Sequence, residues 1–192
     1  EAGFTSTQIS ALTTTQEAGL TPTQISALQV STQLAGLTSA QLGSLTTTQE
    51  AGLSSTQISA LTTAQVAGFT STQISALQVS TQLAGLTSTQ INALTTTQEA
   101  GLTQTQLSAL TSAQASGFSS TQVSSLSATQ LGAFTSTQIT GLTTSGLAGL
   151  TSTQISALTT AQEAGFTSTQ IGSLQVVTQL AGLTSTQISA LQ

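Results

Sequence analysis

The titratable side chains of this sequence are all glutamates: Glu1, Glu17, Glu50, Glu99 and Glu163. Acid–base or nucleophilic catalysis needs a reactive group beside a second group that takes or gives its proton. The many Ser and Thr hydroxyls have no histidine, lysine or cysteine to partner them, and the glutamates stand far apart in the chain. We therefore expect no catalytic residues and no enzyme activity.

Ligand chemistry is equally sparse. Each glutamate offers one carboxylate, whereas a tight calcium site uses several oxygens. The glycines recur at regular intervals without an accompanying lysine, which argues against a phosphate-binding loop. We expect no metal site, no cofactor and no small-molecule substrate.

The charge balance restricts the partners. With a net charge of −5 and no cationic side chain, the chain cannot track a nucleic-acid backbone or an anionic membrane through a basic patch. No apolar run approaches the length of a membrane span, so we expect none. The absence of cysteine excludes a disulfide framework and leaves the compartment open.

A short period runs along the whole sequence. Large apolar anchor residues recur at Phe4, Leu12, Leu20, Leu28, Leu37 and onward to Leu191. Of the 23 complete units between Phe4 and Leu191, 20 have eight residues, and the three that start at Leu28, Leu77 and Leu174 have nine. Such a period indicates a repeat array.

Two longer periods overlay the first. Odd-numbered units tend to read Gln-Ile-Ser-Ala, as at Ile25–Ala27, and even-numbered units Gln-Glu-Ala-Gly, as at Glu17–Gly19, so the repeat is a pair of about 16 residues. The nine-residue units are the fourth, tenth and twenty-second, which fits a super-repeat of six units and about 49 residues, with one copy eroded at Leu126.

Each unit carries the start and stop signals of one short helix. In the unit that begins at Leu150, Thr151 is an N-cap and Gln154 completes a capping box, with Leu150 and Ile155 placed as a hydrophobic staple. Pro22 follows the N-cap Thr21, at the first helical position, where proline is favoured. A Gln recurs in 22 of 23 units, at the fifth position of the eight-residue units and the sixth of the nine-residue units, Gly146 being the exception. We interpret the glycine at position eight as a left-handed helix stop.

Helices of this length are unstable alone, so they must stack. We predict an all-α solenoid of very short capped helices, one per 8-residue unit and two per 16-residue repeat, with a continuous core along the array. Position six of even units accepts Glu, Val, Leu or Ala, so we expect it at the surface. In the nine-residue units Val30 replaces the capping Thr; either the helix runs on through Leu28 or the solenoid bends.

The Thr-x-Thr triplets, such as Thr5-Ser6-Thr7, support an alternative. They resemble the threonine ladders of ice-binding β-solenoids, although the second threonine is often Ala, as at Ala40 and Ala64. Circular dichroism distinguishes the helical from the β reading.

The wording Leu-Thr-Ser-Thr-Gln-Ile-Ser-Ala resembles the Thr/Gln-rich octapeptide tracts of very large bacterial surface and secreted proteins. That resemblance implies an extracellular or cell-surface structural role. We expect residues 1–192 to be one continuous repeat array from a longer chain, because neither end carries an atypical capping repeat.

The expected function is structural. A nearly uncharged, periodic surface meets little repulsion from copies of itself, so we expect self-association into an extracellular filament, sheath or adhesin stalk, with a homopolymer as the partner. A passive spacer and a peptide-binding solenoid remain alternatives.

Overall fold

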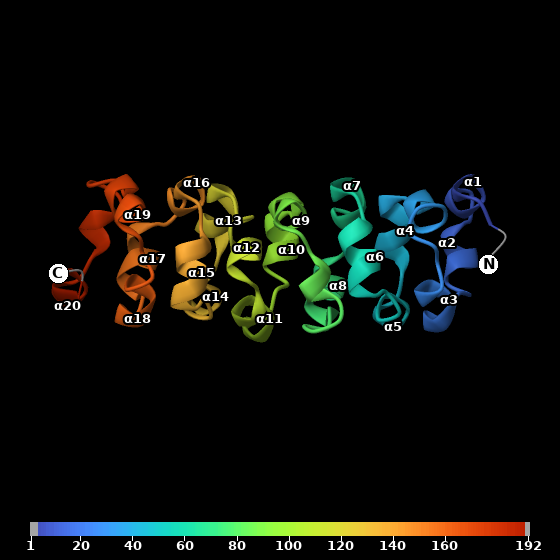
Figure 1. Ribbon diagram of the computed structural model, residues 1–192, viewed down its shortest axis with the longest axis horizontal. Helices are drawn as coiled ribbons and strands as arrows, with labels where there is room; N and C mark the ends of the chain where they lie inside the picture. Colours follow the sequence, from blue (N-terminus) through green and yellow to red (C-terminus); the bar gives the residue numbers. More distant parts are fainter. Residues whose placement is uncertain (1–3, 191–192) are drawn as a thin grey trace. The chain divides into compact units, whose positions relative to one another are not determined.

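The computed structural model describes residues 4–190, and between them the backbone forms short helices and turns with no strand (Figure 1). The predicted all-α solenoid, with one short helix per unit, is confirmed. The β-solenoid alternative, and with it the threonine ladder of an ice-binding surface, is wrong: the Thr-x-Thr triplets of the described residues begin helices or turns.

Local capping explains where the helices begin. The backbone N–H of Thr151 donates to Gln154 Oε1 at 2.9 Å, and the backbone N–H of Gln154 donates to Thr151 Oγ1 at 3.2 Å, which is the predicted capping box at the start of α17. Pro22 is the first residue of α3, as expected from the N-cap Thr21. The α-helices therefore begin where a Thr or Ser side chain of the same unit accepts a backbone N–H of the first turn.

Helix length alternates with the sequence pair. Odd units mostly form six-residue helices such as α6 (Ser55–Ala60), and even units mostly form four-residue helices such as α7 (Thr63–Val66). Leu61 closes the longer helix, whereas Ala67 and Gly68 turn the chain after the shorter one. The 16-residue pair is thus a pair of unequal helices.

The chain divides into two compact units, Glu1–Gly101 and Leu102–Gln192, which are described separately. In each, the helices form three columns. Along a column, each helix packs against the helix three units before or after it, as α3, α5 and α8 do along one edge of the ribbon (Figure 1). The columns of the first unit are α1 (Ser6–Ser10), η1 (Leu34–Gly36), α6 (Ser55–Ala60) and η2 (Leu83–Gly85); α2 (Thr14–Glu17), α4 (Ser39–Ser44), α7 (Thr63–Val66) and α9 (Ser88–Ala93); and α3 (Pro22–Ser26), α5 (Thr47–Glu50), α8 (Ser71–Ala76) and α10 (Thr96–Glu99).

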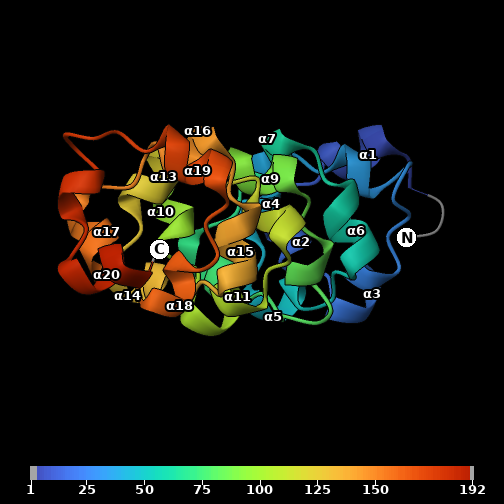
Figure 2. The ribbon, with the colours of Figure 1, turned by 60° about the vertical axis from the view of Figure 1, so that its left-hand side comes forward.

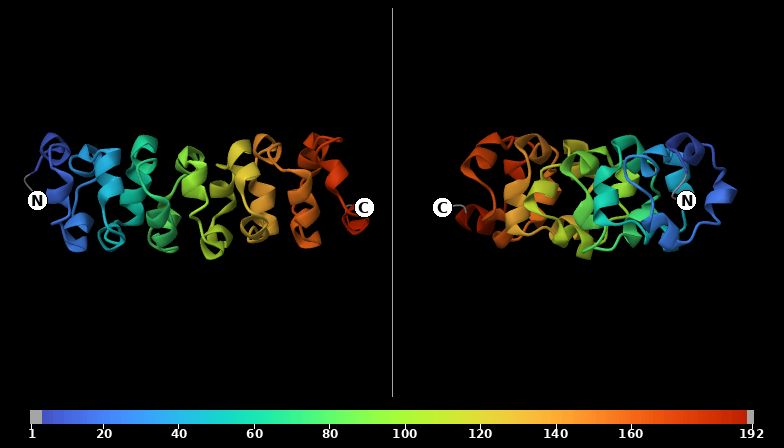
Figure 3. Two further views of the ribbon diagram at one scale, coloured as in Figure 1. Left: turned by 180° about the vertical axis from the view of Figure 1, so that it is seen from behind. Right: turned by 45° about the vertical axis from the view of Figure 1, so that its right-hand side comes forward.

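The second compact unit, Leu102–Gln192, has the same three-column arrangement. Figure 2 and Figure 3 show its short helices and short connections from other directions. Its columns are α11 (Gln104–Ala109), α14 (Ala128–Gly132), α17 (Ser152–Ala157) and η3 (Leu180–Gly182); α12 (Ser112–Ala115), α15 (Ser136–Gly141), α18 (Thr160–Glu163) and α20 (Ser185–Ala190); and α13 (Ser120–Ser125), α16 (Thr144–Leu147) and α19 (Ser168–Ser173).

A turn of the solenoid therefore takes three units, although the sequence alternates every two. The helical pair is not the element that stacks: α4 packs on α2 and α7, which lie three units away on either side. Six is the smallest number of units divisible by both two and three, so the six-unit super-repeat of the sequence corresponds to two complete turns.

The nine-residue units form a turn followed by a 3-10 helix, where the eight-residue units form an α-helix. The preceding helix α3 ends at Ser26 and does not run on through Leu28. The backbone N–H of Leu34 donates to Gln29 O at 2.9 Å, across five residues, and the chain then forms the short 3-10 helix η1. The capping threonine is lost as expected, yet Gln33 Oε1 still accepts the backbone N–H of Gln29 at 2.9 Å. The ninth residue is therefore accommodated by a longer hydrogen-bonded turn, in which the glutamine binds the backbone N–H four residues before it instead of three.

Glycine does not act as the predicted left-handed stop, because no glycine among the described residues has a positive φ. Close packing between turns explains it instead. A Cβ on Gly52 would overlap the carbonyl oxygen of Pro22, three units earlier, and the same holds for Gly149 against Ser120. Glycine permits this close approach of two backbones.

Candidate functional site: an amide ladder, buried glutamates and an uncharged exterior

The recurring glutamine joins successive turns. Gln49 Oε1 accepts the backbone N–H of Thr46 at 3.0 Å at the start of α5. Its Nε2 donates to the carbonyl oxygens of Glu17 and Leu20, both at 2.8 Å, at the end of α2. One amide therefore satisfies the first donor of one helix and two of the last acceptors of another.

The same connection recurs along both compact units, always to the helix four units earlier. The glutamines whose Nε2 reaches two such carbonyl groups within one compact unit are Gln41, Gln49, Gln57, Gln65, Gln73, Gln90, Gln98, Gln138, Gln154, Gln162, Gln170, Gln179 and Gln187. We call this set the amide ladder. Glutamate would serve the capping box equally well but has no N–H₂ group to donate, which explains why the position is glutamine.

Gly146 interrupts the ladder. Thr143 Oγ1 still accepts the backbone N–H of Gly146 at 3.0 Å, so the N-cap of α16 survives without the amide half of the box. By the spacing of its neighbours, a glutamine here would reach the carbonyl oxygen of Phe118. Instead the backbone of Gly146 lies close to the backbone of Phe118, and a Cβ on Gly146 would lie only 2.6 Å from that oxygen.

The internal glutamates lie inside the solenoid, contrary to the expectation that position six of even units is at the surface. Glu17 is 0% exposed, and Glu50, Glu99 and Glu163 are each 1% exposed. Val66, Ala115 and Leu147 occupy the same position in other even units and are also buried. The variety at this position reflects a core that tolerates several side chains, not contact with solvent.

Burial disfavours the charged form of these side chains. Desolvation raises the pKa of Glu50 from 4.5 to about 8, and both of its carboxyl oxygens are buried without a hydrogen-bond partner. Desolvation raises the pKa of Glu17 to about 7, although hydrogen bonds from the Ser44 and Gln41 side chains act in the opposite direction. The pKa of Glu163 is also raised by burial, with Gln187 opposing the shift.

The exterior of the described residues therefore carries no charged side chain. Its four glutamates are buried, and the sequence contains no other charged residue type. The surface consists of hydroxyl, amide and small apolar groups. Its large exposed apolar residues are Phe4, Val176, Val177 and Ile188.

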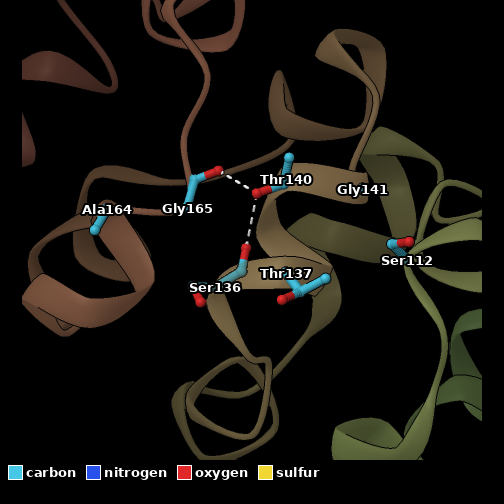
Figure 4. Close-up of a pocket in the computed structure, with 7 residues that line it drawn as sticks. All are labelled: Ser112, Ser136, Thr137, Thr140, Gly141, Ala164 and Gly165. Atoms are coloured by element: carbon cyan, nitrogen blue, oxygen red, sulfur yellow. Dashed lines mark hydrogen bonds between the residues drawn. The ribbon is translucent and has the colours of Figure 1, made fainter.

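Shallow grooves recur on this surface between stacked helices. Figure 4 shows the groove of about 350 Å³ beside α15 and α18, where Thr140 Oγ1 donates to Gly165 O at 2.7 Å and to Ser136 O at 3.0 Å. A groove with the same kinds of residues lies beside α8 and α10 and includes Ser71, Thr72 and Gly101. Hydroxyls and backbone groups of this kind offer hydrogen bonds but no proton-transfer pair.

Glu17, Glu50, Glu99 and Glu163 lie in four different helices, α2, α5, α10 and α18. Among residues 4–190, no three acidic side chains gather into a group that could hold a metal ion. No helix among these residues is long and apolar enough to cross a membrane. The feature that the sequence reasoning missed is the amide ladder, and the near-invariance of Gln at position five, beyond what a capping box needs, is the signal for it.

Comparison with protein families identifies a match to the ALTTAQ repeat over residues 51–79. This segment contains the words Ala60-Leu61-Thr62-Thr63-Ala64-Gln65, which recur at Ala157–Gln162. Comparisons with curated proteins and with solved structures returned no match. The chain is thus a repeat protein, and its residues 51–79 are similar to the ALTTAQ repeat.

Proposed function

We propose that this chain is a structural repeat array without enzymatic activity that associates with copies of itself into an extracellular filament, sheath or stalk. The observation that carries the proposal is the uncharged exterior. Net charge and mixed surface ions normally keep proteins apart. Here the four glutamates of the described residues are inside, so neighbouring copies meet even less repulsion than the net charge of −5 suggests.

The periodic surface supports a repeated contact. The groove beside α15 and α18 and the groove beside α8 and α10 have similar linings of Ser, Thr, Ala and Gly. A contact made at one groove can therefore be made again at another along the same chain. Contacts that join different surfaces without closing into a ring build open polymers.

An extracellular location agrees with the composition. The chain has no Lys or Arg, so trypsin-like proteases find no cleavage site. The resemblance to octapeptide tracts of bacterial surface and secreted proteins supports the same location. The partner in this proposal is a further copy of the array, with no nucleic acid and no small-molecule substrate.

The proposal is tested by adding charge to the exterior. Thr56, Thr105 and Thr153 are exposed at the fourth position of odd units, where a longer side chain points away from the core. We expect the triple Thr→Lys variant to sediment as a smaller species than the unmodified chain at the same concentration. The matched control replaces the same threonines with Gln, which adds length without charge and should leave association intact.

Two other results would decide against self-association. If the unmodified chain sediments as a monomer at all concentrations tested, a passive spacer is the remaining structural role. If association occurs but the Lys and Gln variants lose it equally, a specific hydroxyl contact replaces the absence of charge as the cause. A peptide-binding solenoid would instead show saturable binding of peptides along one face.

A further inference from the structure

Position six of even units is buried whether or not it carries a glutamate. Position six of even units is occupied by Glu50 in α5 but by Val66 in α7 and by Leu147 in α16, and all three are buried. The ladder and the caps use other residues. A glutamate at this position therefore adds a titratable group to a core that forms without one.

The surroundings of Glu50 contain nothing that could neutralise its charge. Its helix α5 packs in its column against α3 and α8, which carry no titratable residue. The residues at the corresponding position of those helices are Ile25 and Ile74, both fully buried. The sequence has no Lys, Arg or His, so no side chain anywhere in the chain can pair with the carboxylate.

Glutamine side chains from later turns bind the backbone of Glu17 and Glu50. Gln82 Nε2 donates to the carbonyl oxygen of Glu50, and Gln49 Nε2, one residue before Glu50, donates to the carbonyl oxygen of Glu17. Movement of α5 away from the core therefore breaks glutamine hydrogen bonds in both directions along the first compact unit. A change at one carboxyl group is mechanically linked to the neighbouring turns.

We propose that Glu17, Glu50 and Glu163 are proton-operated latches: each keeps its turn of the solenoid closed when protonated and releases that turn when ionised. Loss of the proton to solvent leaves a carboxylate inside an apolar core without a counter-charge. Hydration of that carboxylate is strongly favourable, and the turn can reach water by opening locally. The array would then be tightly closed in acid and would loosen, turn by turn, in alkali.

The glutamates are spaced so that each would open one turn and not the whole array. Glu17 and Glu50 lie in separate turns of the first unit, and Glu163 lies in the second. The helices packed along the column of α2 and of α18 carry no titratable residue either: these are α4 for α2, and α15 and α20 for α18. Turns with Val66 or Leu147 at the same position provide an internal comparison.

The test is amide hydrogen exchange on the whole chain between pH 5 and pH 9, corrected for the intrinsic chemical rate. The reporters are the amides of Gly52 and Leu53, which bond to Gln49 O and Glu50 O after α5. For a proton-linked opening, their opening constant should rise by up to tenfold per pH unit and level off above pH 8, because the pKa of Glu50 in the closed turn is about 8 and the carboxyl group is ionised in both states at higher pH.

Matched variants separate the latch from general instability. In Glu50→Val, which copies the natural residue of α7, the opening constant at Gly52 and Leu53 should no longer depend on pH. Glu50→Gln keeps the shape and polarity without the ionisation and should also give a flat profile. Val66→Glu should introduce the dependence at Gly68 and Phe69. An unchanged pH profile in both Glu50 variants would overturn the proposal, whether or not the chain associates with itself.

Discussion

Gln49 Nε2 donates a hydrogen bond of 2.8 Å to the carbonyl oxygen of Leu20, although 29 residues separate them in the sequence. This bond joins the first turn of α5 to the end of α2, which lies in a different column. Stacking within a column buries apolar side chains, whereas the amide ladder ties the columns together. The short helices are thus held by two independent sets of contacts.

The ladder predicts that Gln57→Glu strongly destabilises the chain. Gln57 Nε2 donates to Ile25 O at 3.0 Å and to Leu28 O at 2.9 Å, and a carboxylate there would face two carbonyl oxygens while buried. We expect a loss of about 2–5 kcal/mol in the free energy of unfolding, measured by urea denaturation.

Gln8→Glu is the control for that substitution. Gln8 is exposed and takes part in the capping box of α1, which a glutamate maintains. We expect a change within about 0.5 kcal/mol. Equal effects of the two substitutions would show that glutamine at position five acts through the capping box alone.

Close packing between turns predicts opposite effects for two glycine substitutions. In Gly52→Ala the new methyl group would overlap Pro22 O, and we expect a loss of about 1–3 kcal/mol. Gly132 in α14 has nothing within 4 Å of the added carbon, so Gly132→Ala should be neutral or should stabilise by up to about 1 kcal/mol. Thermal unfolding of the two variants measures both. A destabilising Gly132→Ala with a neutral Gly52→Ala would contradict the packing described for the turns.

The raised pKa values predict that the whole chain is most stable in acid. Glu17 and Glu50 have pKa values of about 7 and about 8 when folded, against an ordinary value of 4.5. The folded chain therefore holds protons that the unfolded chain releases, and stability is greatest below pH 4.5 and falls as the pH rises toward 8.

The size of this effect follows from the shifts. At about 1.4 kcal/mol per pKa unit, the loss above pH 8 amounts to at most about 5 kcal/mol from Glu50, and the smaller shift of Glu17 adds to it in the same direction. The melting temperature at pH 5 should exceed that at pH 8.5, and the double variant Glu17→Gln, Glu50→Gln should reduce the difference. A melting temperature that rises with pH would refute the assignment of these carboxyl groups to the core.

Local signals in the sequence predict much of this fold. The Thr151 and Gln154 box, the position of Pro22 and one helix per unit all follow from backbone donors that must be satisfied near the point where they arise. These interactions span three or four residues, so a short sequence window contains both partners.

Interactions between turns were harder to predict. The pairing of Gln49 with Leu20 spans 29 residues, and the close approach of Gly52 to Pro22 depends on three units completing a turn. The local pattern at Gly52 matches a helix stop equally well. Glu50 occupies position six of an even unit, where Glu, Val, Leu and Ala all occur. This variety suggested that the position is exposed to solvent, because a buried carboxyl group without a counter-charge is uncommon.

Negative-stain electron microscopy of the purified chain at neutral pH and high concentration tests the proposed function most directly. If the uncharged exterior promotes repeated contacts between copies, the micrographs should show filaments or bundles, and these should be lost in the triple Thr→Lys variant at Thr56, Thr105 and Thr153. A field of well-dispersed single particles of the unmodified chain at every concentration would contradict self-assembly.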